Sequence, residues 1–189
     1  MGPLDRAAVF AALAQGLDLP QVLARFGLTR GELQKLFQEA AGHYRHQQES
    51  QQQGFWRLYC DGASRGNPGP AGAGAVLYDP RGELAAQQEE YLGQATNNVA
   101  EYRALLLGLK LARDLQVPRL RILADSQLLV RQLTGRYRVK SPHLFPLWQQ
   151  ARKELQNFEA CAIAQVPRAE NQEADALANR AIDLKSASG

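Results

Sequence analysis

Four acidic residues fall where strands or helices are expected to begin or end. Asp61 and Asp125 follow apolar segments with the composition of buried strands, and Glu101 and Asp175 lie in the first turns of two expected helices. The carboxyl ends of neighbouring parallel strands meet at one edge of a sheet, where open α/β sheets bind their ligands. We therefore expect these side chains to gather around one site.

Four gathered carboxylates point to divalent cations. They repel one another unless a cation neutralises them, and a ligand set of oxygens without histidine or thiolate suits Mg²⁺, or Mn²⁺ as a substitute, over zinc. Two such ions can hold the attacking and the leaving oxygen of a displacement at phosphorus. The acids thus predict phosphoryl chemistry with two metal ions per site.

Each acid also has a purely structural interpretation. Glu101 stands three residues after Asn98 and would complete a capping box, while Asp175 would interact with the positive end of its helix. Asp125 would be a helix cap and Asp61 part of a turn. The glycine-rich segment beside Asp61 and the placement of two acids after strands favour the shared site.

The expected elements alternate in type after residue 54. Alternating apolar residues predict three strands first, the second and third joined by a tight turn. Helical spacing and short apolar runs then predict a helix, a strand, two helices, a strand and a final helix. This order implies an α/β fold, with a five-stranded mixed sheet flanked by helices. The strands are expected at 55–61, 71–78, 83–92, 120–124 and 159–166, and the helices at 99–115, 126–133, 144–157 and 172–184.

The composition is that of a folded, mildly basic chain. Of its 189 residues 45% are apolar and 22% charged, with a formal net charge of +3, which excludes wholesale disorder and a polycationic coat. Cys60 and Cys161 lack the spacing of a zinc motif and suit a reducing compartment. No apolar run approaches the roughly 18 residues that cross a bilayer. We therefore expect a cytoplasmic protein without membrane contact.

A glutamine-rich stretch at residues 46–54 is expected to be a linker. It holds five glutamines and no aliphatic side chain, so it cannot anchor a core. Residues 1–45 predict three short helices, of which the third begins with a capping box of Thr29 and Glu32 and forms a helix-turn-helix-like pair with the second. Residues 1–53 carry five basic and five acidic side chains, whereas DNA-binding modules usually have a basic face. A protein contact and a nucleic-acid contact both stay open for this all-α module.

Four segments together are similar to the signatures of type 1 ribonuclease H, in the order and spacing of that family. The resemblance covers residues 55–185, which would form a catalytic domain with a ribonuclease H-like fold, and leaves 186–189 as a tail. It implies an endonuclease that hydrolyses the RNA strand of RNA–DNA hybrids and leaves 5′-phosphate and 3′-hydroxyl ends. The segments are Asp61-Gly62-Ala63-Ser64-Arg65-Gly66-Asn67-Pro68-Gly69-Pro70-Ala71-Gly72-Ala73-Gly74, Thr96-Asn97-Asn98-Val99-Ala100-Glu101, Asp125-Ser126-Gln127 and Asn171-Gln172-Glu173-Ala174-Asp175-Ala176-Leu177-Ala178.

The resemblance also implies a role for each matched residue. Asp61 would bridge both metal ions, Asp175 would bind the ion that activates water, and Glu101 and Asp125 would hold the ion at the leaving oxygen. The position of Glu101 also contacts a 2′-hydroxyl in the family. Short amides and hydroxyls can recognise that group, although helix capping is the alternative for the two asparagines before Glu101. The positions that match contacts with the hybrid's backbone and minor groove are Asn67, Thr96, Asn97 and Gln127.

Two features differ from the pattern of many bacterial members. Those members carry a histidine in a Gly-His loop before the last acid, whereas this chain has Val-Pro-Arg at 166–168, a form found in a subset of the family. Arginine stays protonated and cannot be a general base, so Arg168 is expected to bind phosphate or to pair with Glu170 or Glu173. The connection at 134–143 is short and lacks the inserted helix that forms a basic handle in other members.

A basic stretch compensates for the missing handle. Residues 126–153 contain no acid and six basic residues, with aromatic side chains and His143 between them. Such a stretch suits the phosphates and sugars of the DNA strand. The alternative places Phe145 and Trp148 in the core. The basic residues are Arg131, Arg136, Arg138, Lys140, Arg152 and Lys153.

Two other functions fit the same fold. One is a catalytically silent module that binds hybrids, and the other is a related polynucleotidyl transferase such as a resolvase or an exonuclease. The complete set of four acids disfavours the first. The motifs at 62–74 and 171–177 disfavour the second, because they match ribonuclease H.

Overall fold

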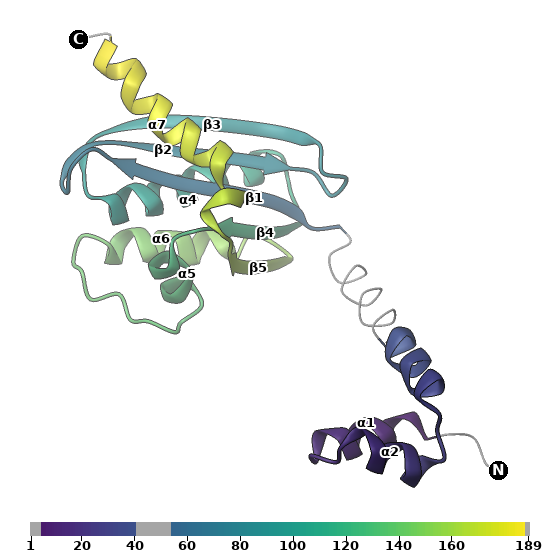
Figure 1. Ribbon diagram of the computed structural model, residues 1–189. Coiled ribbons are helices and arrows are strands. Elements are labelled where there is room, and N and C mark those ends of the chain that lie inside the picture. Colours follow the sequence, from purple (N-terminus) through teal and green to yellow (C-terminus); the bar gives the residue numbers. More distant parts are fainter. Residues whose placement is uncertain (1–4, 41–53, 188–189) are drawn as a thin grey trace. The chain divides into compact units, whose positions relative to one another are not determined.

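The computed structural model describes residues 5–40 and 54–187 (Figure 1). The chain divides into two compact units, Met1–Gln53 and Gly54–Gly189, and the described part of each has an apolar core of its own. The predicted linker lies outside the described residues except for Gly54. No helix within the described ranges is long and apolar enough to span a lipid bilayer.

The described part of the first unit contains the three predicted helices. They are α1 (Arg6–Ala14), α2 (Leu19–Phe26) and an unlabelled helix over residues 30–40. Side-chain caps fix where the last two begin: Asp18 and Gln21 form a reciprocal capping box before α2. Thr29 and Glu32 form the predicted capping box at the start of the helix over residues 30–40.

Small apolar side chains form the core of this unit. The buried residues of the core cluster are Val9, Ala12, Val22 and Leu33, and Leu36 is buried as well. Phe37 of the third helix is 43% exposed, and its ring packs edge-on against Phe10 at 5.6 Å.

The second unit is built on the predicted five-stranded mixed sheet. Its strand order is β3-β2-β1-β4-β5. β1 pairs with β2 and β2 with β3 in antiparallel fashion, while β1–β4 and β4–β5 are parallel. The strands are β1 (Trp56–Ser64), β2 (Gly69–Tyr78), β3 (Leu84–Ala95), β4 (Arg119–Ala124) and β5 (Ala160–Gln165).

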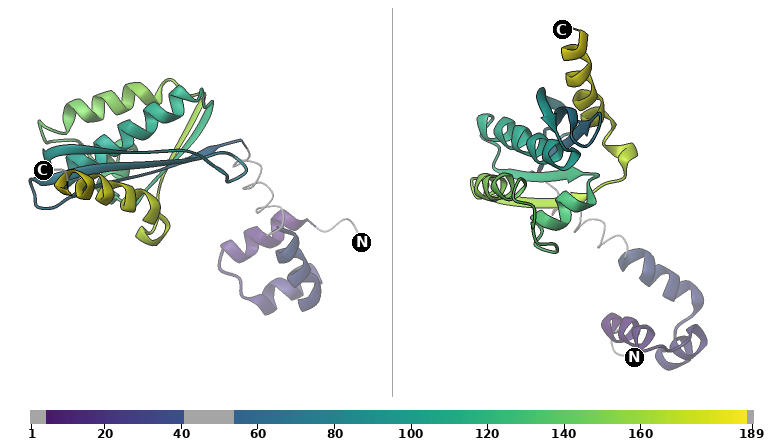
Figure 2. Two further views of the ribbon diagram at one scale, coloured as in Figure 1. Left: turned by 90° about the horizontal axis from the view of Figure 1, so that it is seen from above. Right: turned by 90° about the vertical axis from the view of Figure 1, so that its left-hand side faces the viewer.

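Helices cover the two faces of the sheet unequally. α4 (Asn97–Asp114), α5 (Gln127–Leu133) and α6 (Phe145–Leu155) share the main core on one face. On the other face α7 (Gln172–Ala187), which follows the short 3₁₀-helix η1 (Arg168–Glu170), packs against β1, β2 and β3 (Figure 2). α7 continues to Ala187, past the predicted end at Leu184 and into the predicted tail.

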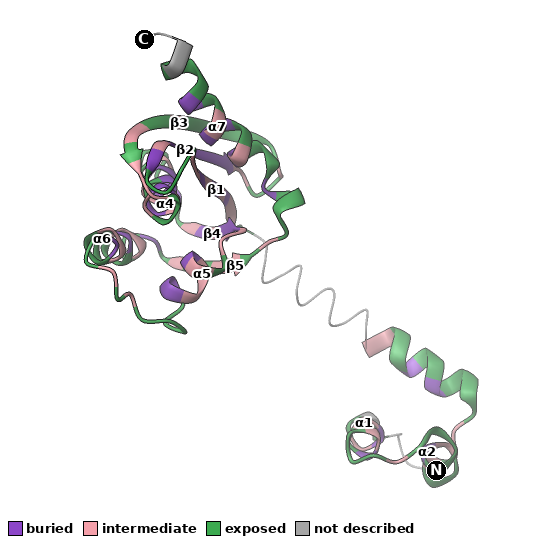
Figure 3. Ribbon diagram, turned by 60° about the vertical axis from the view of Figure 1, so that its left-hand side comes forward, coloured by how far each residue is buried: buried purple, intermediate pink, exposed green. Residues whose placement is uncertain are grey.

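The main core consists of aliphatic side chains from the inner face of the strands and from α4. Leu58, Leu77 and Ile122 meet Leu105 and Leu109 there, all of them fully buried. Figure 3 shows this distribution, with the buried residues concentrated on β1, β2, β4 and the inward side of α4. Burying each such side chain contributes roughly 1.5–3 kcal/mol, so this face fixes α4 on the sheet.

The connection between α5 and α6 contains turns but no helix. Trp148 packs against the main core, and its indole N–H donates to the Gln132 carbonyl at 3.3 Å, so the core interpretation is confirmed for this residue. Phe145 is 43% exposed and stays at the surface. Arg131 stacks on Tyr137, with its guanidinium carbon 4.9 Å from the ring centroid.

Candidate active site

Strand pairing brings Asp61 and Asp125 close together. The parallel ladder between β1 and β4 ends with Tyr59 opposite Leu123, and each acid follows two residues later, Asp61 within β1 and Asp125 directly after the end of β4. Since side chains alternate between faces, both acids lie on the same face as that last pair. β4 ends at Ala124, directly before Asp125, as predicted.

Asp61 lies inside a strand, not at its end as predicted. β1 separates from β4 after Tyr59 but continues along β2 to Ser64, with Asp61 opposite Gly74. Pairing with the antiparallel neighbour therefore continues along β1 past the point where pairing with β4 ends.

Glu101 reaches the site because α4 lies unusually close to β1. A Cβ atom on Gly62 would be only 2.1 Å from the carbonyl carbon of Ala100, so only glycine fits this crossing. The helix begins at Asn97, and Thr96 is its N-cap, accepting a hydrogen bond from the Val99 amide at 3.4 Å. Glu101 therefore lies beyond the first turn, and the predicted capping role of Asn97, Asn98 and Glu101 is wrong.

Asp175 is brought in by a second close crossing. Where α7 crosses β2, a Cβ atom on Gly74 would lie 2.3 Å from the carbonyl oxygen of Ala174. Asp175 lies in the first turn of α7, as predicted. Glycines on two strands thus let two helices approach the sheet at the height of the acids.

All four acids line one cavity of about 390 Å³. Polar groups predominate around it. The other lining residues are Gly62, Ala63, Ser64, Asn97, Ser126, Arg168 and Asn179.

Burial and mutual repulsion make two of the acids hard to ionise. Burial first, and then the charges of Asp125 and Asp175, raise the pKa of Asp61 to about 8. Burial also raises the pKa of Glu101, against the effect of its hydrogen bonds. Glu101 accepts one from the Asn97 amide at 3.0 Å and another from the Ser126 hydroxyl. A site in which carboxylates resist ionisation favours the binding of a counter-charge.

The buried side chain of Asn171 orients Asp125 through a hydrogen bond. It is 1% exposed, and its Nδ2 donates to the carbonyl of Cys60 at 3.1 Å and to Oδ1 of Asp125 at 3.0 Å. Its own Oδ1 is buried without a partner. The sequence placed Asn171 only within a motif and gave it no role, since nothing in the pattern shows that it faces Asp125.

Replacing Asn171 by alanine is expected to lower the free energy of unfolding by about 2 kcal/mol, because the Cys60 carbonyl and Asp125 lose a buried donor. Chemical denaturation measures this loss. Asn179→Ala is the matched control: Asn179 is only half-buried and its amide bonds a helix carbonyl at 2.9 Å. An equal effect of both substitutions would contradict the orienting role.

Arg168 contacts the site through Asp175. The two side chains form an ion pair at 2.9 Å, so the predicted alternative partners are wrong, and Glu173 instead accepts a hydrogen bond from the Tyr78 hydroxyl. The hydrogen bond that Arg168 donates to Asp175, together with the negative charge of Asp175, raises the pKa of Arg168 above its ordinary value. The guanidinium side chain remains 78% exposed.

The other predicted contact residues lie at the rim. Asn67 is exposed between β1 and β2, and its Oδ1 accepts from the Asn97 backbone amide at 3.3 Å. Gln127 is exposed at the first position of α5. Four residues were predicted to contact the hybrid's backbone and minor groove. Asn97 lines the cavity itself, while Asn67, Thr96 and Gln127 do not.

The donor set fits a hard divalent cation. Four carboxylates around one polar cavity offer the oxygen ligands that Mg²⁺ prefers. Among the residues that the structure describes, no three acid, histidine or cysteine side chains already converge as metal ligands do. The acids instead bond to neighbours: Asp175 to Arg168, Asp125 to Asn171 and Glu101 to Ser126. Small side-chain rotations would be needed to release these oxygens.

Comparisons with known proteins identify the family. A family model described as reverse transcriptase-like matches residues 59–181. The ribonuclease HI of Halobacterium salinarum is 46% identical over 125 residues, which cover 66% of this chain and 63% of that protein. A ribonuclease H of Coxiella burnetii is 36% identical over 148 residues, covering 70% of this chain and 93% of its own. The chain thus spans a little under two thirds of the archaeal relative's length.

Solved structures agree in fold. The crystal structure of RNase H1 from Halobacterium salinarum superposes with a TM-score of 0.67 at 45% identity, over 69% of this chain and 98% of that one. LC11-RNase H1, solved in complex with an RNA/DNA hybrid, gives a TM-score of 0.64 at 37% identity, and the match covers 69% of this chain and 98% of that one. The chain therefore belongs to the reverse transcriptase-like family, among the type 1 ribonucleases H.

Proposed function

We propose that the protein is an endoribonuclease that hydrolyses the RNA strand of RNA–DNA hybrids and leaves 5′-phosphate and 3′-hydroxyl ends. The observation that carries this proposal is the convergence of four carboxylates from β1, β4, α4 and α7 on one cavity. The relatives named ribonuclease H and the neighbour solved with a hybrid support the substrate.

Within this proposal, Asp61, Glu101, Asp125 and Asp175 would hold two Mg²⁺ ions, which Mn²⁺ could replace. The ions would supply charge neutralisation at the scissile phosphate and a more acidic water. Asp61 would lie between them and Asp175 on the side of the attacking water. Asn171 and Ser126 would keep Asp125 and Glu101 aligned through the hydrogen bonds described above.

Arg168 is proposed to bind phosphate at the end of the cycle. Its guanidinium cannot act as a base, but it is exposed and lies next to Asp175. With a cation held by Asp175, the guanidinium would be available to bind the new 5′-phosphate and help it leave.

The hybrid itself would be held by rim residues and by the basic stretch at 126–153. Asn67, Thr96, Asn97 and Gln127 are suited to sugar and backbone contacts, since short amides and hydroxyls both donate and accept. On the basic stretch, Tyr137 and Phe145 are exposed, which supports a handle-less track for the DNA strand. Binding is therefore expected to weaken steeply with salt.

The direct test is incubation of a labelled RNA–DNA hybrid with the protein and Mg²⁺. Internal cuts in the RNA strand that disappear with EDTA are the expected result. Duplex DNA and single-stranded RNA of the same sequence are the controls and should stay intact. Cleavage of duplex DNA would favour a different polynucleotidyl transferase, and binding without cutting would favour a silent module.

Removing residues 1–50 is expected to leave the rate of hydrolysis at saturating hybrid unchanged, because the acids and their supports all lie in the second unit. A contribution of the first unit to hybrid affinity would appear as an increase in KM. Measuring the saturated rate and KM at several salt concentrations distinguishes a nucleic-acid contact of the first unit from a protein contact. A KM that is unchanged at every salt concentration assigns it to a protein contact.

A further inference from the structure

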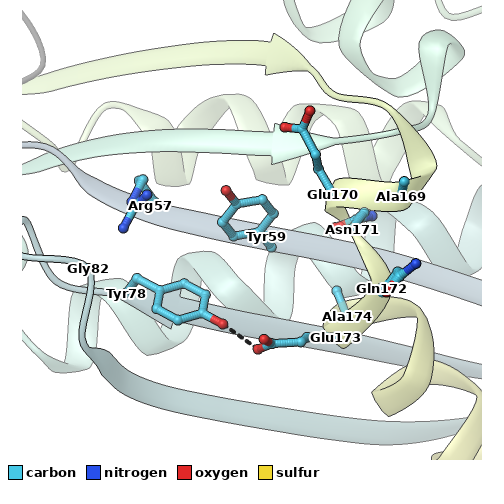
Figure 4. A pocket seen from close by; sticks show the side chains of 10 residues that line it. All are labelled: Arg57, Tyr59, Tyr78, Gly82, Ala169, Glu170, Asn171, Gln172, Glu173 and Ala174. Atoms are coloured by element: carbon cyan, nitrogen blue, oxygen red, sulfur yellow. Dashed lines mark hydrogen bonds between the residues drawn. The ribbon is translucent and has the colours of Figure 1, made fainter.

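A second cavity, of about 330 Å³, lies on the α7 side of the sheet. Figure 4 shows Tyr59 and Tyr78 on neighbouring strands below it, Arg57 at one end and Glu170 and Glu173 at the other. Tyr59 and Tyr78 meet edge to face with centroids 5.8 Å apart. The cavity does not contain any of the four acids.

α7 covers this side of the sheet only in part: it packs on β1, β2 and β3, where Tyr59 contacts the cluster that contains Ala174 and Leu177, and β4 and β5 are not among its main contacts. Strand register places Arg57 of β1, Arg121 of β4 and Ala162 of β5 in one row. Leu58, Leu120 and Ile122 face the main core, so this row faces the opposite side. We call the row together with Tyr59 the open face.

Two basic residues occupy neighbouring backbone positions on the open face, and the guanidinium of Arg57 lies over the Tyr78 ring, 5.8 Å from its centroid. Arg57 and Arg121 are register partners on adjacent strands, about 4.8 Å apart in backbone position. Neither has an acidic partner among the described residues, where all ion pairs involve other arginines. Like charges at neighbouring positions repel, and an anion bound between the two side chains would offset that repulsion.

The open face continues directly into the active site. Arg57, Tyr59 and Asp61 alternate along one face of β1, and Arg121 and Leu123 do so along β4, which ends directly before Asp125. Four residues of strand correspond to about 13 Å. A strand of nucleic acid that leaves the acids along the sheet would therefore reach the arginine pair within a short distance.

The mixed charges around the second cavity suit a nucleotide better than a simple anion. A phosphate would lie between Arg57 and Arg121, which are planar multidentate donors. A base in the cavity would contact Tyr59, and its amino group could donate to Glu170 or Glu173. Aromatic surface beside a basic strip is the usual arrangement for single-stranded nucleic acid.

From these observations we propose that the open face binds a single-stranded extension of the substrate, with one phosphate between Arg57 and Arg121 and its base in the second cavity. The proposal rests on the proposed function for the identity of the substrate. The contact would favour hybrids that carry a single-stranded tail over blunt ones.

The test compares a short blunt hybrid with the same hybrid carrying a single-stranded DNA tail at either end. Affinities are measured by fluorescence anisotropy with the full chain carrying Asp61→Asn, which is expected to prevent cleavage. A tail is expected to improve affinity by about tenfold. The double substitution R57Q/R121Q should remove this advantage and reduce the salt slope of tailed-hybrid binding by about 0.7, the value for one single-strand phosphate contact.

Two further variants keep the result interpretable. R57K/R121K retains both charges and should keep most of the salt slope. R81Q removes a nearby exposed arginine that already pairs with Asp79 and Glu83, and it should leave the advantage of the tail intact. Hydrolysis of the blunt hybrid, measured with Asp61 present, should be the same in R57Q/R121Q and in the unaltered chain.

Three outcomes would overturn the proposal while leaving the proposed function intact. The first is equal affinity for blunt and tailed hybrids alongside normal cleavage of the blunt one. The second is a tail advantage that survives R57Q/R121Q. The third is competition by an acidic peptide as effective as by an oligonucleotide of the same charge, since the face would then recognise charge alone. Absence of blunt-hybrid cleavage would instead count against the proposed function.

Discussion

Asp61→Asn is expected to reduce hydrolysis of an RNA–DNA hybrid by roughly a thousandfold, equivalent to about 4 kcal/mol of transition-state stabilisation. Asparagine keeps the shape of the side chain but removes the charge from a carboxylate that interacts electrostatically with both Asp125 and Asp175. A neutral amide is a weak ligand for Mg²⁺, so the site would lose its shared ligand. Steady-state cleavage of a labelled hybrid in excess Mg²⁺ measures the effect.

The same substitution is expected to stabilise the metal-free protein. Folding raises the pKa of Asp61 from 3.8 to about 8, so ionising this group costs free energy in the folded state. That cost is absent below about pH 4, grows as the pH rises and is complete above about pH 8. Since asparagine cannot ionise, the variant should be more stable by roughly 4 kcal/mol near pH 7, and the gain should vanish near pH 4.

Asp114→Asn is the matched control for both effects. Asp114 is an exposed aspartate at the end of α4, 3.8 Å from Arg113, and its substitution should change neither turnover nor stability by a measurable amount. Urea unfolding in EDTA at several pH values gives the stability comparison. Near-normal turnover of Asp61→Asn would show that the metal assignment is wrong, and a loss of stability at neutral pH would contradict the electrostatic account.

Gly62→Ala is expected to destabilise the protein by about 3 kcal/mol and to inactivate it. The new methyl group would lie 2.1 Å from the Ala100 carbonyl carbon and 2.2 Å from the Glu101 amide nitrogen. Both are backbone atoms, so rotation of a side chain cannot relieve the clash and α4 must move. Glu101 would then leave the cavity, and activity would fall even in the molecules that remain folded.

Thermal and urea unfolding measure the first effect, and cleavage per folded molecule measures the second. Gly31→Ala is the control, because its Cβ atom would meet only the Thr29 hydroxyl at 4.0 Å and alanine favours a helix. It should be neutral or stabilising. A Gly62→Ala protein with unaltered stability would show that the close crossing of α4 over β1 is not rigid.

The sequence predicted the order and type of the elements well, because that information is local. The periodic apolar residues of 99–115 and the short apolar run at 120–124 each correspond to one observed element, with boundaries shifted by one or two residues. Strand ends were less certain. β1 extends through Asp61 to Ser64 because it pairs with β2, and a long-range pairing of this kind leaves no mark on the local pattern.

The clustering of the acids was predictable, but the contacts that hold them were not. The acids could be placed at one sheet edge from the strand order that the pattern implied. The predicted ion-pair partners of Arg168 were wrong. Arg168 begins a 3₁₀ turn over residues 168–170, and its guanidinium pairs with Asp175. The roles of Asn171 and Gly62 depend on which backbone atoms meet across the fold, and spacing along the chain does not contain that information.

Crystallography with Mn²⁺ tests the central claim most directly. The unaltered protein would be crystallised with a hybrid whose scissile phosphodiester resists hydrolysis, and anomalous scattering would locate the ions. Two peaks among Asp61, Glu101, Asp125 and Asp175, both in contact with the RNA strand, are the expected result. Ions bound elsewhere, or a hybrid seated away from these four carboxylates, would contradict it.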